Sequence, residues 1–365
     1  MARKKKRADG RIVITKTYNG KRKFFYGATT AEAERKREAY EQEQSKNIYS
    51  SDILYDEWLD AWLEYISANI SPSTLKSYEC VVNAHLRSEL GQYSLAEITS
   101  PLLREFLNKK KDSGLSARSV EYMHTLLKTS LRLAVDDDLL IKNPMDKIKK
   151  PKKEPTKKIV ALTQEQVNDF LKGVDNQEIY RLFYVALATG LRRSEILGLR
   201  WRDIDYENKT ITVDEPVIKV GTKVIISKTT KNKTSNRTLY IDDQTINILR
   251  QQRKSVLERQ LKTFGYIDND LVFPSDSGNP RSPDWLSRTA TLHGKKTGMP
   301  ASFSFHSLRH THATLLLKSG VHFKIVQARL GHSTFQQTMD TYSHVTPDMD
   351  KAAAEKASSF FVVKL

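Results

Sequence analysis

The chain has 365 residues, of which 39% are apolar and 28% are charged, and it carries a net charge of +17. This length exceeds a typical single hydrophobic core and predicts two or three domains of a globular protein. No stretch approaches the roughly 20 apolar residues of a membrane span, and a single cysteine, Cys80, excludes an intrachain disulfide and a multi-cysteine zinc site. Because no membrane anchor is evident either, the positive charge makes nucleic acid the expected partner.

The first 50 residues are strongly basic, with 14 Lys and Arg against 6 Asp and Glu. No apolar stretch follows the opening MARKKKRADG, so we interpret it as the basic tail of a cytoplasmic protein. In residues 11–27, two β-rich runs flank Asn19-Gly20, which predicts a hairpin, and a helix should begin at Thr29 or Thr30. The strand side chains that can face a DNA groove, or form only an exposed polar surface, are Lys16, Lys21, Arg22 and Lys23.

Residues 51–146 have the spacing of an all-α domain. LYDEWLDAWLEYI repeats apolar residues three and four apart, and Ser71-Pro72 is a cap followed by a proline in the first turn. Four or five short helices with short loops indicate a bundle. The basic block KIKKPKKEPTKK, residues 147–158, follows and predicts an interdomain linker that can also track phosphates.

Residues 159–365 mix helical and β patterns. Thr163 is a candidate cap, and IYRLFYVALATG predicts a buried helix that ends at Gly190. Three β-runs follow, TITVDEPV, KVIISKTT and NRTLYID, before the chain returns to helices. This order predicts an α+β domain with a small antiparallel sheet between helical sets.

The stretch HSLRHTHATLLLK contains three histidines and one arginine ahead of an apolar run. No Asp or Glu lies between His306 and Lys318, which argues against a zinc helix. A helix start that presents His306 and Arg309 suits a phosphate, because free N–H groups and the helix dipole attract anions there. A structural salt bridge is the other interpretation of Arg309. For His310 and His312 we expect packing or surface roles.

A second arginine-rich stretch is TGLRRSEILGLRWRDID. Arg192 and Glu195 share one helical face, either as a surface ion pair or with Glu195 holding the guanidinium toward a phosphate. The remaining arginines, interpreted as contacts to the DNA backbone or as solvent-exposed, are Arg193, Arg200 and Arg202.

Three further side chains complete a candidate site. A lysine in the predicted turn that holds Lys228, Lys231 and Lys233 can act as a general acid. His332 follows Gly331, and Tyr342 lies ten residues later. A tyrosine that meets arginines, histidines and a lysine is a candidate nucleophile toward phosphorus.

The ordered set of Arg192, Lys231, His306-Ser-Leu-Arg309, Leu-Gly-His332 and Tyr342 resembles the tyrosine recombinase family, of the phage-integrase type. The resemblance implies a multidomain fold. Residues 1–48 resemble an arm-site DNA-binding module, a three-stranded sheet plus a helix. Residues 51–146 resemble an all-α, SAM-like core-binding domain, and residues 159–365 resemble the α+β catalytic domain with a C-terminal tail.

The resemblance also implies the chemistry. Tyr342 would attack a DNA phosphodiester and form a 3′-phosphotyrosyl bond, while Arg192 and Arg309 would stabilise the negative charge. Lys231 would protonate the leaving oxygen and His306 would assist proton transfer from Tyr342. His332 would donate to a phosphate oxygen, and Glu195 would orient the site. No metal and no other cofactor is needed, because guanidinium and ammonium groups supply the charge.

The implied partners are double-stranded DNA with attachment sites, a homotetramer on that DNA, and a host bending factor or an excision helper. The apolar end Phe360–Val363 would pack on a neighbouring protomer or on its own domain. Lys231 is preferred over Lys228 and Lys233 because its distance to Arg237 matches the family pattern.

Two other functions are compatible with parts of the sequence. A type IB topoisomerase would use similar chemistry to relax DNA. LLLKSGVHFKIVQARLGH has a glycine between two predicted helices, as in a helix-turn-helix regulator, which would not need Tyr342.

Overall fold

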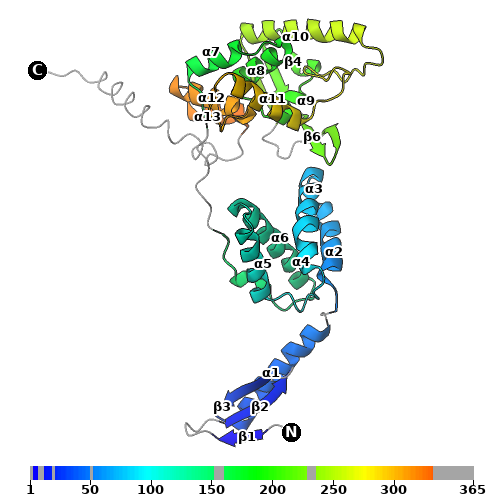
Figure 1. Cartoon of the computed structure of the whole chain (residues 1–365), viewed down its shortest axis with the longest axis vertical. Coiled ribbons are helices and arrows are strands. Elements are labelled where there is room, and N and C mark those ends of the chain that lie inside the picture. The colour runs from blue at the N-terminus through cyan, green and yellow to red at the C-terminus, as the bar shows by residue number, and fades with distance from the viewer. Residues whose placement is uncertain are drawn as a thin grey trace, which may run out of the picture. The chain divides into compact units, whose positions relative to one another are not determined.

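The computed structural model describes residues 3–6, 12–18, 21–49, 52–151, 160–227 and 236–331 (Figure 1). The chain divides into two compact units, Met1–Pro155 and Thr156–Leu365. Within the described ranges, no helix is both long enough and apolar enough to cross a bilayer.

The first unit begins with an antiparallel sheet in the order β1-β2-β3, formed by Arg3–Lys6, Ile12–Tyr18 and Lys21–Gly27, and followed by α1, Thr30–Tyr49. The first strand corrects the interpretation of the basic start as a tail only, because Arg3–Lys6 pairs with Ile12–Thr15. Ile14 and Phe25 are cross-strand partners and are buried with Ala33 of α1. One face of the sheet is therefore covered by the helix.

The helices of the same unit are α2 Tyr55–Ser67, α3 Pro72–Val81, α4 Arg87–Leu90, α5 Ser100–Asp112 and α6 Ala117–Asp136, with a π-helical turn, Val82–Leu86, between α3 and α4. The predicted cap forms, since the Ser71 hydroxyl accepts from the Thr74 N–H. Trp58 and Trp62 are buried in the core, where Trp58 Nε1 donates to the Ser130 carbonyl at 3.0 Å. The bundle thus buries its aromatic residues between the helices.

The linker was expected to begin at residue 147, but the packed part of this unit extends to Ile148. Pro144–Lys147 forms a 3-10 turn, Met145 is fully buried, and Ile148 packs against the helical core. The Ile148 carbonyl oxygen lies 2.9 Å from His124 Nε2.

The second unit contains the helices α7 Gln164–Lys172, α8 Gln177–Thr189, α9 Arg193–Gly198, α10 Asp243–Lys262, α11 Pro283–Lys296, α12 Phe305–Lys318 and α13 Phe323–Leu330. Its strands form two separate sheets. One has the order β4-β5-β8, Ile204–Asp205, Thr210–Val213 and Arg237–Tyr240, and the other pairs β6 Val217–Val220 with β7 Lys223–Ile226. The middle β-run therefore makes its own hairpin instead of joining its neighbours in one sheet.

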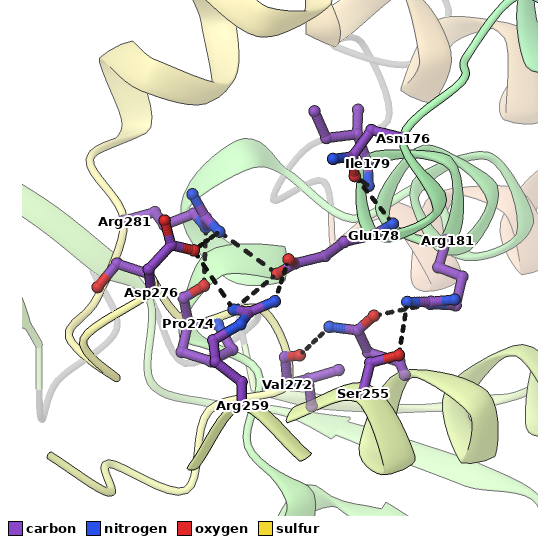
Figure 2. A network of polar contacts seen from close by, with 12 residues as sticks. Asn176, Glu178, Ile179, Arg181, Ser255, Arg259, Val272, Pro274, Asp276 and Arg281 are labelled. Carbon is purple, nitrogen blue, oxygen red and sulfur yellow. Dashed lines mark hydrogen bonds and ion pairs between the residues drawn. The ribbon is translucent and has the colours of Figure 1, made fainter. Parts of the chain in front are cut away.

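A polar network holds the first half of α8 against α10 and the segment before α11 (Figure 2). Glu178 accepts ion-pair contacts from Arg259 and Arg281. Arg181, which is 7% exposed, donates from Nε to Gln252 at 2.8 Å and from Nη2 to Ser255 at 2.9 Å. Because α8 is fixed in this way at one end, the turn at its other end has a defined position.

Candidate active site

The turn that ends α8 places Arg192. Gly190 has a φ of +67°, and a Cβ at this position would lie 2.6 Å from His312 Cδ2, so glycine is required for both its backbone and its size. Arg192 follows as the N-cap of α9. Its Nη1 donates to Glu195 Oε1 at 2.6 Å, and its backbone N–H donates to Oε2 at 2.9 Å. Glu195 therefore holds both the side chain and the backbone of Arg192.

A second arginine shares the Glu195 carboxylate. Arg237 Nη2 donates to Oε2 at 2.8 Å and Nη1 donates to Oε1 at 3.2 Å. Glu195 is 7% exposed, and this burial acts to raise its pKa. The hydrogen bonds and charges of Arg237 and Arg192 outweigh burial and lower the pKa to about 2. The carboxylate is therefore ionised at neutral pH and firmly paired.

Arg309 of α12 is 2% exposed. Its Nη1 donates to the Gly190 carbonyl at 2.8 Å, and its Nη2 donates to the Leu330 carbonyl at 2.6 Å. This placement corrects the expectation that the start of the helix presents Arg309 at its surface together with His306. The two carbonyls belong to the ends of α8 and α13, which only the tertiary fold brings together. Arg309 thus joins three helices beside Arg192.

His306 lies one turn ahead of Arg309 and is exposed to a cavity of about 410 Å³. The cavity is lined by Arg192, Arg193, Ser194, Ser287, Ser304, Phe305 and His306. The protein around the imidazole displaces much of its water, and this desolvation, with the positive charges of Arg309 and Arg192, lowers the pKa of His306 to about 4. The ring is therefore neutral at pH 7 and able to accept a proton.

The end of α13 is held by three arginines on three successive carbonyls. Arg237 Nε donates to the carbonyl of Arg329 at 2.6 Å, Arg309 Nη2 to that of Leu330 at 2.6 Å, and Arg192 Nη2 to that of Gly331 at 2.8 Å. Helix C-termini carry partial negative charge, so cations are favourable there. Sequence reasoning used Arg237 only to choose between lysines and missed it as a member of this cluster.

Several expected site residues lie outside the described residues: Lys228, Lys231, Lys233, His332, Tyr342 and the tail Phe360–Val363. Their roles stay predictions. The sequence continues from Gly331 directly into His332.

Of the histidines expected to pack, His312 is 6% exposed, and its Nδ1 lies 2.8 Å from the Leu187 carbonyl oxygen. The His310 ring meets that of His306 edge-on, with 4.6 Å between the ring centroids. In the part of the chain that the structure describes, no three His, Cys, Asp or Glu residues are grouped so that they could hold a metal ion.

The arginines expected at the DNA backbone have protein partners. Arg202 Nη2 and Arg200 Nη2 lie 3.1 and 2.6 Å from Glu215 Oε2, and Arg193 Nη1 donates to Ser287 Oγ at 2.9 Å. Arg202 is half exposed, so its pairing leaves it accessible.

The basic side chains of the N-terminal sheet do not all lie on the same face. Lys16 and Lys23 are cross-strand partners on the side of α1. There Lys16 Nζ pairs with Glu41 at 2.8 Å, and Lys23 Nζ lies 3.4 Å from the centroid of the Tyr40 ring. Arg22 alternates with them and is exposed on the other face, and Lys21 begins β3.

Residues 161–349 match the model of the phage integrase family, and residues 54–111 match the phage integrase N-terminal SAM-like domain. The chain therefore belongs to the phage integrase family and is an enzyme of the tyrosine recombinase class, of the integrase type. A tyrosine recombinase XerC-like protein of Caldanaerobacter subterraneus subsp. tengcongensis is 31% identical over 96% of this chain and 95% of its own length. The ICEBs1 integrase of Bacillus subtilis is 26% identical over 90% of this chain and 88% of its own.

Two solved structures share the fold. The Tn1549 transposon integrase in complex with a circular intermediate DNA superposes with a TM-score of 0.70 at 23% identity, covering 84% of this chain and 100% of that chain. A lambda integrase tetramer bound to a Holliday junction superposes with a TM-score of 0.61 at 20% identity, covering 93% and 95%. The expected fold class, with a helical SAM-like domain ahead of a tyrosine-recombinase catalytic domain, is confirmed.

Proposed function

We propose that this protein cuts and rejoins DNA at attachment sites to integrate and excise a mobile element. The observation that carries the proposal is that Arg192 and Arg309 lie near the cavity-facing imidazole of His306. Glu195 fixes the Arg192 guanidinium. Two arginines beside a neutral histidine suit a phosphodiester, because phosphoryl transfer needs positioning and positive charge more than covalent machinery. The ICEBs1 integrase and the Tn1549 transposon integrase support the same substrate class.

In the proposed first step, the hydroxyl oxygen of Tyr342 attacks phosphorus and its proton passes to His306. The bond from phosphorus to the 5′-oxygen breaks, and Lys231 gives that oxygen a proton. Arg192 and Arg309 stabilise the charge on the non-bridging oxygens, and His332 donates to one of them. The products are a 3′-phosphotyrosyl bond and a free 5′-hydroxyl. Attack by the 5′-hydroxyl of a partner duplex reverses the step and rejoins the strands.

The neutral state of His306 fits its part in this step. An imidazole with a pKa of about 4 in the DNA-free protein has its acceptor nitrogen available at pH 7. A bound phosphate adds negative charge, which would raise this pKa toward neutrality and make the proton transfer more favourable.

The proposal also assigns a separate role to each domain. Residues 1–48 bind arm-type sites, 51–146 bind the core site, 147–158 form a basic linker, and 159–365 carry out catalysis. In the first module the face opposite α1 is the better candidate for DNA, because Arg22, Phe24 and Tyr26 are exposed there. Lys16, Lys21, Lys23 and Arg202 remain proposed contacts, with Lys16 and Lys23 also engaged by α1.

We also propose that four copies assemble on double-stranded DNA in the cytoplasm, at the nucleoid, with a host bending factor or an excision helper as a further partner. The lambda integrase tetramer on a Holliday junction supports this assembly. The apolar tail Phe360–Val363 would dock on a neighbouring protomer. Deleting residues 356–365 should then weaken tetramer formation on DNA; unchanged complexes and unchanged recombination would contradict the docking.

Recombination itself tests the proposal. Two DNA fragments that carry candidate attachment sites should exchange strands when the protein is added, and fragments without the sites should not. A supercoiled plasmid that lacks the sites serves as the control. Relaxation of that plasmid without strand exchange between the fragments would instead indicate a topoisomerase.

A further inference from the structure

Arg237 connects two parts of the site through hydrogen bonds, the Glu195 carboxylate and the Arg329 carbonyl. It is the first residue of β8, and its side chain is 8% exposed. Two of its nitrogens contact Glu195, and its Nε contacts the Arg329 carbonyl oxygen at 2.6 Å. A guanidinium fork can serve these acceptors together, whereas a single ammonium group would have to choose among them.

The first consequence concerns charge. Arg192 and Arg237 share one carboxylate, so the group of three has a net charge of +1. Without Arg237, Glu195 would neutralise Arg192 alone, and the positive charge available to a phosphate would fall by one unit. A change of one unit of charge this close to the phosphate acts strongly on a developing oxyanion.

The second consequence concerns position. Arg237 holds the carbonyl of Arg329. Arg309 holds the next carbonyl, that of Leu330, and Arg192 holds the one after it, that of Gly331. The Gly331 carbonyl belongs to the planar peptide unit that leads into His332. Arg237 therefore fixes the first of three successive anchor points at the end of α13.

We propose that Arg237 is a positioning residue for strand cleavage, which acts through Glu195 and the end of α13 to keep Arg192 oriented and charged toward the scissile phosphate. This inference rests on the proposed function. Arg237 touches neither the phosphate nor the nucleophile in this scheme, so its loss should slow the chemical step and leave DNA binding nearly unchanged.

The test compares Arg237→Gln with the unaltered protein in single-turnover formation of the covalent adduct on saturating nicked attachment-site DNA. Misplacement of a reacting group by about 1 Å can cost about 100-fold in rate, and we expect a loss between tenfold and that figure. The dissociation constant for DNA should change by less than about threefold, since Arg237 makes no phosphate contact in this scheme. Arg250→Gln, which removes an exposed arginine of α10 that lies over the Tyr206 ring, is the matched control and should keep the normal cleavage rate.

A double-mutant cycle separates positioning from simple loss of stability. If Arg237 acts through Glu195, then Arg237→Gln should slow cleavage by less than about threefold in a Glu195→Gln background, because its main partner is already altered. Thermal unfolding of each variant sets an assay temperature at which all are folded. If Arg237→Gln does not fold, Arg237→Lys takes its place and should slow cleavage at unchanged DNA affinity.

Two results would overturn the inference. The first is a normal cleavage rate in Arg237→Gln, or in Arg237→Lys where that variant replaces it. The second is a loss of cleavage rate that is fully additive with the loss in Glu195→Gln. If the unaltered protein forms no adduct, the proposed function fails, and this outcome is distinct from a failure of Arg237 alone.

Discussion

Arg192 and Gly331 are 139 positions apart in the sequence, yet Arg192 Nη2 donates a 2.8 Å hydrogen bond to the Gly331 carbonyl oxygen. This bond joins the start of α9 to the end of α13. Because Glu195 holds the other side of the Arg192 guanidinium, the arginine is anchored at both ends of its fork. The site is therefore organised before DNA binds, which is the condition under which electrostatic stabilisation costs no rearrangement.

Gly331→Ala should impair cleavage more than it impairs folding. Gly331 has a φ of +63°, and a Cβ would lie 3.0 Å from Arg237 Nη1, so alanine strains the backbone and pushes on the arginine. Gly320→Ala is the control, since Gly320 has a φ of +83° but open space around its Cβ position. Both should lower the free energy of unfolding by about 1 kcal/mol. Only Gly331→Ala should slow adduct formation at least tenfold. Equal rates of adduct formation in Gly331→Ala and Gly320→Ala would refute the contact between residue 331 and Arg237.

Glu195→Gln should change how stability depends on pH. The folded-state pKa of about 2 lies below the usual 4.5, so the paired carboxylate stabilises the fold above pH 4.5 and loses this contribution as pH falls toward 2. The difference corresponds to about 3 kcal/mol at neutral pH. Urea unfolding between pH 3 and 7 should show a smaller loss toward acid in Glu195→Gln. Parallel curves for the two proteins would contradict the pairing.

His306 should titrate near pH 4 in the DNA-free protein, well below an ordinary histidine. Its depressed pKa means that the unfolded chain binds the proton more readily, so stability decreases as pH falls from 6.5 to 4. After desolvation, the positive charge of Arg309 is the largest cause of the lowered His306 pKa, so Arg309→Gln should raise this pKa. Proton NMR of the imidazole resonances, assigned with His306→Gln, measures both values. A normal pKa of about 6.5 would argue against a desolvated site.

The two faces of the N-terminal sheet should contribute unequally to binding of arm-type DNA. Arg22→Gln should weaken binding, because an exposed guanidinium is lost. It should also reduce the magnitude of the slope of log K against log salt concentration by about one. Lys16→Gln should do less, since Lys16 already pairs with Glu41. Titrations at several salt concentrations distinguish the two. An equal effect would mean that DNA displaces the Lys16 ion pair.

Local signals in the sequence predicted several helix boundaries in both units. The caps Ser71 and Thr163 and the helix end at Gly190 depend on neighbouring residues only, and all three form as expected. Pairing of Arg3–Lys6 with β2 was missed, because a run of cations has no β pattern. Likewise, β8 pairs with β5 across an intervening hairpin, a choice that no local pattern encodes.

The sequence proposes members for the candidate site but does not indicate their geometry. Residue order and spacing were enough to select Arg192, His306 and Arg309. The burial of Arg309 could not be predicted, since its partners are carbonyls at the ends of α8 and α13. Arg237 escaped notice because its partners, Glu195 and Arg329, are distant in sequence and identify it only in three dimensions.

The nature of the covalent intermediate tests the proposed mechanism most directly. The protein is incubated with nicked attachment-site DNA, which traps the cleaved strand, and the protein–DNA adduct is isolated and mapped by peptide mass analysis. We predict a phosphotyrosyl bond at Tyr342 that is absent from Tyr342→Phe, while that variant binds the DNA with nearly normal affinity. An adduct that persists in Tyr342→Phe, or one that maps to another residue, would contradict the assignment of the nucleophile.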